Sequence, residues 1–283
     1  MAQADAIPAS PAHACGFAAS HRKDNWWAGP MATALGLGAF GVYATFRAIY
    51  NGQYVVGIDT EVQATTHAHL LSPFYSPLLT GLIPTSMRGW FSPAFLILWA
   101  PGGFRLTCYY YRKAYYRAFF MDPVGCSVGE PDNFCGIKRG LAYKGETKLL
   151  LFQNLHRYFL YLALGFLVIL SYDFVLACIW PTPSGGRTFG LSLGSLVLAA
   201  NVTLLSLYTL GCHSLRHLVG GRVNSFSRAP LGKLRYQLWR AASALNRGHM
   251  LWAWLSLFMV GFADFYVWMV ALGVFPDPAF LGG

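Results

Sequence analysis

Five long apolar runs limit what this 283-residue sequence can fold into. Each is long enough for a helix that crosses a lipid bilayer, which takes about 20 residues. Only 11% of the residues are charged, whereas a soluble domain carries about 25%. We therefore predict an all-α integral membrane protein with five transmembrane helices. The runs are approximately Pro30–Tyr50, Pro93–Tyr116, Leu149–Trp180, Phe189–Leu218 and Leu251–Phe275.

Basic residues alternate between the segments that connect these runs. The segments after the second and fourth runs, about 117–148 and 219–248, are rich in Lys and Arg, whereas those after the first and third contain only Arg88 and Arg187. Cytoplasmic loops of membrane proteins carry an excess of Lys and Arg. We therefore expect a multi-pass protein of the plasma (inner) membrane, with its N-terminus cytoplasmic and its C-terminus outside. The net charge of +10 then reflects topology and contact with membrane lipid, and we expect no nucleic-acid partner.

Two further segments lie outside the predicted helices. Residues 1–23 contain no basic stretch followed by an apolar run, so they do not resemble a secretory signal. We expect a flexible cytoplasmic tail there, followed by an anchor domain of residues 24–283. Within the segment 219–248, apolar residues recur at helical spacing beside basic ones, which is typical of an amphipathic helix on the inner membrane surface. These positions are Leu231, Leu234, Leu238, Ala241, Ala242 and Leu245.

Thiol and imidazole groups gather near the predicted inner face. A single buried histidine or cysteine is more often structural. Ionisable groups within a membrane span, however, mark a functional site by default, and here several predicted helices bring them to one depth. The group as a whole therefore predicts a metal or redox centre. Its members are Cys108, His156, Cys212, His213, His217 and His249.

Three cofactors use ligands of these types. Structural zinc sites combine Cys and His, but usually with closely spaced ligands in soluble domains. Haem b in a helix bundle takes one His from each of two helices and leaves the cysteines without a role. A Rieske-type [2Fe–2S] cluster takes two thiolates on one iron and two imidazoles on the other. The residues present favour the Rieske arrangement, with haem b as the alternative cofactor.

Five blocks of the sequence resemble the membrane subunit of actinobacterial-type (type F) succinate dehydrogenase, a complex II whose anchor lacks haem and carries a membrane-embedded Rieske-type cluster. The blocks are Trp26–Trp27, Ser72–Pro77, Arg105–Arg117, Gln153–Tyr158 and Cys212–His217. The resemblance implies soluble flavoprotein and iron–sulfur protein subunits docked on the inner face. It also implies that the anchor passes electrons to a quinone, expected to be menaquinone, and so joins the tricarboxylic acid cycle to the respiratory chain.

Within this resemblance the cluster ligands can be assigned to positions of the sequence. We expect the two thiolates to lie at matching depths near the inner boundary, and the two imidazoles to come from the third and fourth predicted helices. The expected ligands are Cys108, His156, Cys212 and His217, with Cys126 and His213 in reserve.

A quinone site needs an apolar slot, an aromatic wall and a hydrogen-bond donor. Residues of suitable type and predicted depth are Trp26, Trp27, Tyr109, Arg112 and His249. Trp and Tyr are also enriched at membrane interfaces for reasons unrelated to a ligand.

Two other functions fit parts of the pattern. A haem b-containing complex II anchor is the alternative within the same class, and a non-redox membrane transporter or scaffold is the alternative from another class. Asp264 lies within the fifth run, where a carboxyl group is costly, and is a candidate for a proton path. The sequence contains no Gly-rich dinucleotide turn and little soluble mass, so we expect no catalysis by this chain alone.

Overall fold

The computed structural model describes most of the chain and divides it into two compact units. One consists of Met1–Gly38 with Tyr109–Leu149, and the other of Ala39–Cys108 with Leu150–Gly283. The predicted cytoplasmic tail and nearly all of the first predicted inner loop lie outside the described residues. Those described are 24–25, 27–57, 68–87, 89–119, 149–182, 185–221 and 223–282.

Four helices among the described residues are long and apolar enough to cross a membrane. They correspond to the first, third, fourth and fifth apolar runs, and three of them contain no proline. The described residues thus provide four candidate membrane spans, one fewer than predicted. The four helices are α1 (Ala28–Tyr50), α5 (Leu149–Ala177), α6 (Leu193–Leu210) and α9 (His249–Ala271).

The second predicted run does not form one unbroken helix, so a fifth membrane-spanning helix is not confirmed among the described residues. It is divided into α2 (Ala94–Ile97), α3 (Trp99–Thr107) and α4 (Tyr109–Phe119). The helix stops at Cys108, whose φ of −63° and ψ of 127° are extended. An apolar run predicts which residues avoid water. It does not predict where the backbone leaves the helical conformation.

The fourth predicted run is interrupted in the same way. α6 ends at Leu210, and Cys212 adopts φ −65° and ψ 137° before α7 (His213–Gly220) begins. After a short 3₁₀ turn at Phe226–Arg228, the helix predicted from the leucine spacing is present as α8 (Gly232–Arg247). Both cysteines therefore lie in extended joints between two helices.

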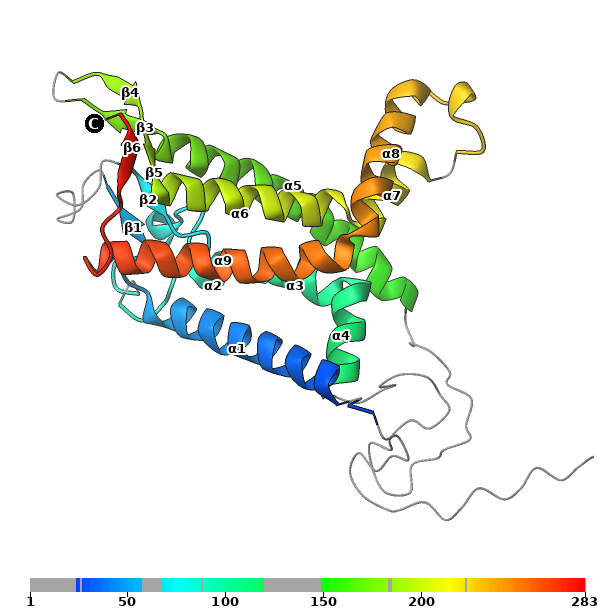
Figure 1. Ribbon diagram of the computed structural model, residues 1–283, viewed down its shortest axis with the longest axis horizontal. Coiled ribbons are helices and arrows are strands. Elements are labelled where there is room, and N and C mark those ends of the chain that lie inside the picture. Colours follow the sequence, from blue (N-terminus) through cyan, green and yellow to red (C-terminus); the bar gives the residue numbers. More distant parts are fainter. Residues whose placement is uncertain are drawn as a thin grey trace, which may run out of the picture. The chain divides into compact units, whose positions relative to one another are not determined.

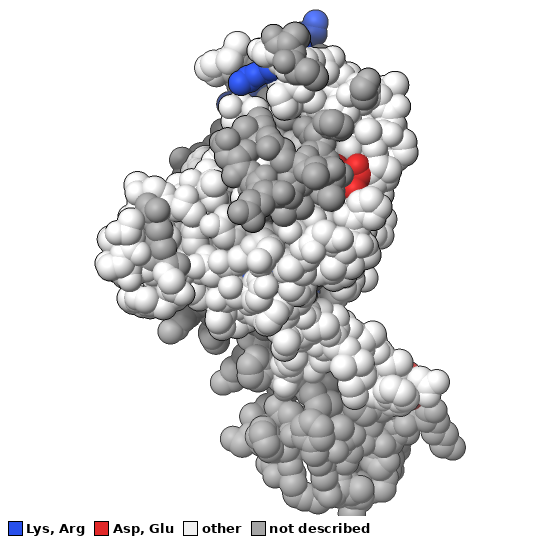
Figure 2. All heavy atoms as spheres, turned by 90° about the vertical axis from the view of Figure 1, so that its left-hand side faces the viewer, with Lys and Arg blue, Asp and Glu red and all other residues white. Residues whose placement is uncertain are grey.

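Short strands form three antiparallel pairs in the described part of the chain. Within the second unit they gather at the end away from α7 and α8, which we call the strand end (Figure 1). Figure 2 looks onto the strand end, where few charged side chains are visible among the described residues. The pairs are β1 (Val55–Val56) with β2 (Leu70–Leu71), β3 (Ile179–Pro181) with β4 (Arg187–Phe189), and β5 (Leu191–Ser192) with β6 (Ala279–Leu281).

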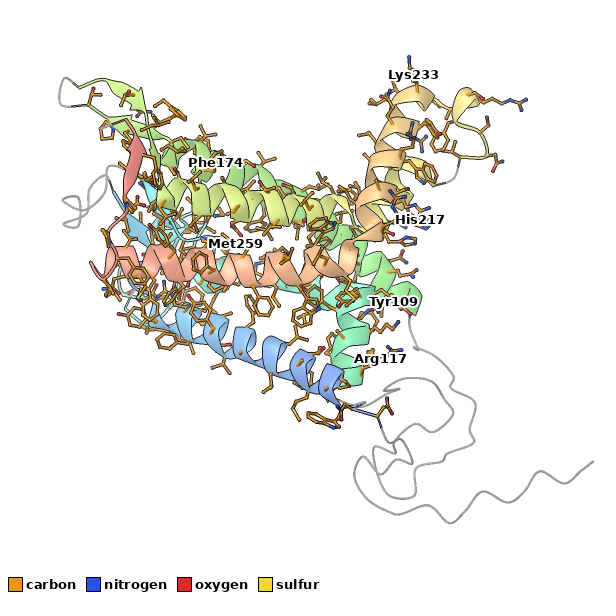
Figure 3. The ribbon with its side chains drawn as sticks, in the orientation of Figure 1. Tyr109, Arg117, Phe174, His217, Lys233 and Met259 are labelled. Carbon is orange, nitrogen blue, oxygen red and sulfur yellow. The ribbon has the colours of Figure 1, made fainter. Side chains whose placement is uncertain are left out.

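An apolar core joins α5, α6 and α9 in the second unit. α6 and α9 lie side by side (Figure 1), and Leu198 and Val267 are among the residues buried between them. Phe174 of α5 and Met259 of α9 pack against the same core (Figure 3). At the strand end, Ser192 and Ser195 form a reciprocal capping box that starts α6, which satisfies backbone donors that a helix leaves free.

A buried ion pair connects the second half of α1 to α9. Arg47 Nε lies 2.7 Å from Asp264 Oδ2, and both side chains have 0% exposure. The Tyr43 hydroxyl donates to Oδ2 at 2.5 Å, and the Ser72 hydroxyl donates to Oδ1 at 2.5 Å. The Asp264 carboxylate therefore has bonds on both oxygens, as a charge buried in a membrane protein requires. A proton path through Asp264 stays a prediction.

Candidate metal centre

His156 lies in the second unit with both ring nitrogens next to polar partners. Its Nε2 is 3.1 Å from Cys212 Sγ, and its Nδ1 is 3.0 Å from Thr107 Oγ1. The ring of Phe104 stacks on the imidazole, with centroids 4.6 Å apart and planes 5° from parallel. Since His156 is buried, these contacts hold its ring in one orientation.

A second Cys–His pair involves Cys108 and His249. Cys108 Sγ lies 3.8 Å from His249 Nε2, and the His249 ring stacks on Tyr208 with centroids 5.0 Å apart. His249 Nδ1 is buried and has no hydrogen-bond partner among the described residues. A buried nitrogen without a partner is costly, so this position can accommodate a ligand or a bound group.

The two pairs belong to one cluster of side chains. Burial, followed by the charge of the nearby Cys108, raises the pKa of the Cys212 thiol to about 11, against the opposing effect of hydrogen bonds from Ser214 and Leu215. The Phe104 and Tyr208 rings, which cover the two imidazoles, contact each other at 5.5 Å. A metal that binds here must displace the thiol proton, because cysteine ligates as the thiolate.

Local sequence explains why three of the four residues lie at helix joints. Gly211 allows the chain to leave α6, since a Cβ there would lie 2.8 Å from the Leu207 carbonyl oxygen. Asn246 Nδ2 donates to the Gly211 carbonyl oxygen at 2.8 Å and fixes the joint to the end of α8. Gly248 separates α8 from α9, so that His249 is the first residue of the following helix.

The four groups lie in two Cys–His pairs. Among the described His, Cys, Asp and Glu side chains, no three converge closely enough to hold one metal ion. Instead, two thiols and two imidazoles form two adjacent pairs, and neither Cys108 nor Cys212 is in a disulfide. A [2Fe–2S] cluster of the Rieske type distributes its two Cys and two His ligands over two irons.

Among the described contacts, neither His217 nor His213 bonds to Cys108 or Cys212, although the charge of His213 acts on the His249 ring. Both are exposed on α7, with their rings 4.7 Å apart, and Figure 3 shows His217 pointing outward from that helix. Burial, followed by the charges of His217 and Arg216, lowers the pKa of His213. Cys126 lies outside the described residues.

Most of the expected quinone residues lie in the first unit or outside the described residues. Tyr109 and Arg112 are on α4, with the Arg112 guanidinium 5.9 Å from the Tyr109 ring centroid. Trp27 is exposed just before α1, and Trp26 lies outside the described residues. His249 is the member of this set that the second unit brings to the thiols.

An apolar cavity of about 200 Å³ lies beside the Cys–His cluster. Phe104 and Tyr208, which stack on the two histidines, form part of its wall. Arg105 also lines it, with its guanidinium 4.8 Å from the Tyr208 ring and a hydrogen bond to Ser256 Oγ at 3.0 Å. At the far end the wall includes Phe74, which neighbours the Ser72 that binds Asp264.

Sequence reasoning did not select Arg105 or Thr107 as site residues. Both belong to the block Arg105–Arg117 that carries the resemblance, but their roles depend on contacts with α5 and α9. The signal that was available for Arg105 is its charge inside an apolar run. Nothing in the local sequence distinguishes Thr107 from any other threonine near the end of a helix.

Comparison with known proteins identifies the family. Residues 28–273 match the family model described as actinobacterial succinate dehydrogenase subunit SdhC. The chain belongs to this SdhC family. A solved structure, described as the Mycobacterium smegmatis Sdh1 complex in the apo form, contains a chain that is 40% identical, with a TM-score of 0.73. The match covers 93% of this chain and 94% of that one.

The family match confirms the coarser predictions from the sequence. The chain is an SdhC-type membrane anchor of succinate dehydrogenase, in agreement with the resemblance of its sequence blocks. No curated protein shows a significant match.

Proposed function

We propose that this SdhC chain passes electrons from docked flavoprotein and iron–sulfur protein subunits to a quinone in the plasma membrane. We further propose that Cys108, Cys212, His156 and His249 hold a Rieske-type [2Fe–2S] cluster. The observation that carries the proposal is the pairing of two buried thiols with the buried imidazole of His156 and the half-buried imidazole of His249, which come from separate helices. When bound, such a cluster accepts and releases one electron at a time at a higher potential than an all-cysteine cluster.

The residues around the four ligands support this assignment. Phe104 and Tyr208 stack on the two imidazoles and cover one face of each ring, which favours a defined ring orientation. In both pairs the imidazole presents its Nε2 to the sulfur, His249 to Cys108 and His156 to Cys212. Iron would hold both sulfurs as thiolates, since metal binding releases the thiol protons.

His249 replaces His217 in the proposed ligand set. His249 Nε2 lies 3.8 Å from Cys108 Sγ and its ring is covered by Tyr208, whereas His217 is exposed on α7. A ligand to a buried cluster must itself reach the buried thiols. We therefore place His217 and His213 on the surface of α7, outside the ligand set. Cys126 stays the reserve candidate for a thiolate ligand.

The apolar cavity is the proposed slot for the quinone. Phe104 and Tyr208 supply an aromatic wall, and Arg105 supplies a charged donor for a carbonyl oxygen, which is the combination that such ligands require. Because Tyr208 also stacks on His249, a quinone here would lie next to a cluster ligand. For Trp26, Trp27, Tyr109 and Arg112, a contact with the quinone stays a prediction from the sequence.

Single substitutions in the whole complex test the ligand assignment. We expect His156→Ala and His249→Ala each to abolish quinone reduction and the EPR signal of the cluster, while succinate oxidation with a soluble dye continues. His217→Ala is the matched comparison and should retain both. If His217→Ala loses the signal and His249→Ala keeps it, the ligand is His217. A sharp haem α-band in the optical spectrum would instead favour the haem b anchor.

A further inference from the structure

Thr107 bonds to both its own helix and His156. Its Oγ1 is 2.7 Å from the Gly103 carbonyl oxygen and 3.4 Å from that of Phe104, and it is 3.0 Å from His156 Nδ1. A separation of 2.7 Å between two oxygens is typical of a hydrogen bond, and without a proton between them the two would repel. Because the carbonyl cannot donate, the hydroxyl proton must point to Gly103.

This geometry determines which nitrogen of His156 carries the proton. A threonine hydroxyl has one proton and two lone pairs, so with its proton on Gly103 it can only accept from His156. Nδ1 must then be the N–H nitrogen, and Nε2 is left with the lone pair that lies 3.1 Å from Cys212 Sγ. Phe104 stacks on the ring and opposes the flip that would exchange the two nitrogens.

We propose that Thr107 is the positioning residue that fixes this tautomer, so that His156 binds iron through Nε2. The inference rests on the proposed function, because it requires a cluster at the site. Histidine ligands of metals usually donate their other N–H to an acceptor that orients the ring and raises its basicity. Thr107 supplies that acceptor from the last residue of α3, next to the thiolate ligand Cys108.

The two imidazoles are therefore held differently. His156 Nδ1 is bound to Thr107, whereas His249 Nδ1 has no partner among the described residues. Loss of the Thr107 acceptor should weaken one imidazole ligand and leave the other unchanged. A more basic ligand favours the oxidised, more positive iron, so removing the acceptor should also raise the midpoint potential of the cluster.

The chain offers a matched control. Thr203 Oγ1 donates to the carbonyl oxygen of Ala199 at 2.8 Å on an exposed face of α6, so it makes the same helix bond without a histidine. Thr107→Val keeps the shape of the side chain and removes the acceptor for His156, whereas Thr107→Ser keeps that acceptor. Thr203→Val measures the effect of losing only the hydrogen bond from a threonine hydroxyl to a carbonyl oxygen of its own helix. All three are made in the full complex.

Iron retention under a chelator and the midpoint potential are the readouts. We expect Thr107→Val to retain iron about 10- to 100-fold less well, the range usual for loss of such an acceptor, and to have a higher midpoint potential. Thr107→Ser and Thr203→Val should match the wild type. The inference is overturned if Thr107→Val matches the wild type in both readouts, or if Thr203→Val loses iron equally. A wild-type complex without iron and acid-labile sulfide in this chain overturns the proposed function itself.

A measurement on the wild type avoids dependence on how the variants fold. The complex is prepared with histidine labelled with ¹⁵N at Nε2 only, and in parallel at Nδ1 only, and the reduced cluster is examined by pulsed EPR. The Nε2 label should give the strongly coupled ¹⁵N signal. If every strongly coupled nitrogen is an Nδ1, Thr107 does not set the ligand atom of His156.

Discussion

Gly103 shows how one residue controls the approach of α3 to α5. A Cβ added there would lie 2.2 Å from the Phe159 ring, whereas at the neighbouring Gly102 nothing lies within 4 Å. The Gly103 carbonyl oxygen also accepts the Thr107 hydroxyl proton. The close contact that this glycine permits is therefore linked directly to the orientation of His156.

We expect Gly103→Ala to destabilise the protein by about 1–3 kcal/mol, the usual cost of overpacking, and to lower the iron content, because α3 must shift. Gly102→Ala is the control, and it should change neither property. Thermal unfolding of the detergent-solubilised complex, together with iron analysis, checks both variants. Equal behaviour of the two would show that the α3–α5 contact does not matter for the site.

Three of the four proposed ligands could be selected from the sequence, and the fourth could not. Cys108, Cys212 and His156 were identified by residue type and by depth at the end of an apolar run. The choice of His217 followed from extending the fourth helix through Cys212. The chain instead breaks at Cys212, so α7 carries His217 on an exposed face, and His249 reaches the thiols from α9.

At the scale of elements, hydropathy predicted helices where the chain stays helical and failed where the backbone becomes extended. The runs that became α1, α5, α6 and α9 follow from length and composition alone. The joints at Cys108 and Cys212 are each only one or two residues long. They are too short to change the mean hydropathy of a segment as long as a membrane span. Such joints are set by local backbone geometry and by tertiary contacts such as that of Asn246 with Gly211.

The ion pair between α1 and α9 gives a prediction at this scale. Asp264→Asn leaves the buried Arg47 without its counter-charge, so we expect a loss of about 3–5 kcal/mol in stability. The double substitution Arg47→Met with Asp264→Leu should cost less than the two single changes together, because no charge is left buried. Thermal unfolding of the solubilised complex measures each variant.

A comparison with Asp173 separates the stability that comes from the Arg47–Asp264 ion pair from the stability that comes from a hydrogen bond to a buried carboxylate. The Ser76 hydroxyl donates to Asp173 Oδ2 in the same unit, and no arginine pairs with Asp173 among the described ion pairs. Because the amide oxygen of Asn can still accept from Ser76, Asp173→Asn should cost no more than about 0.5–1.5 kcal/mol, the net value of one hydrogen bond. If Asp264→Asn is no worse than Asp173→Asn, the Arg47–Asp264 pair does not hold α1 to α9.

At the scale of the whole molecule, the family assignment agrees with the pattern of the entire sequence. The match spans residues 28–273, a range that holds the four proposed ligands and all of the apolar runs except the last two residues of the fifth. A membrane anchor was predictable because composition and charge alternation act over the whole chain. The cofactor depends on a few side chains whose meeting requires the tertiary fold, and for that reason it needs a direct measurement.

Low-temperature EPR of the reduced, purified succinate dehydrogenase complex is that measurement. The account predicts a signal with a lower average g value than those of all-cysteine clusters, present in the wild type and absent when His156 is replaced by alanine. A complex that reduces quinone without such a signal, or that carries haem in its place, would contradict the assignment of a cysteine–histidine iron–sulfur centre to this anchor.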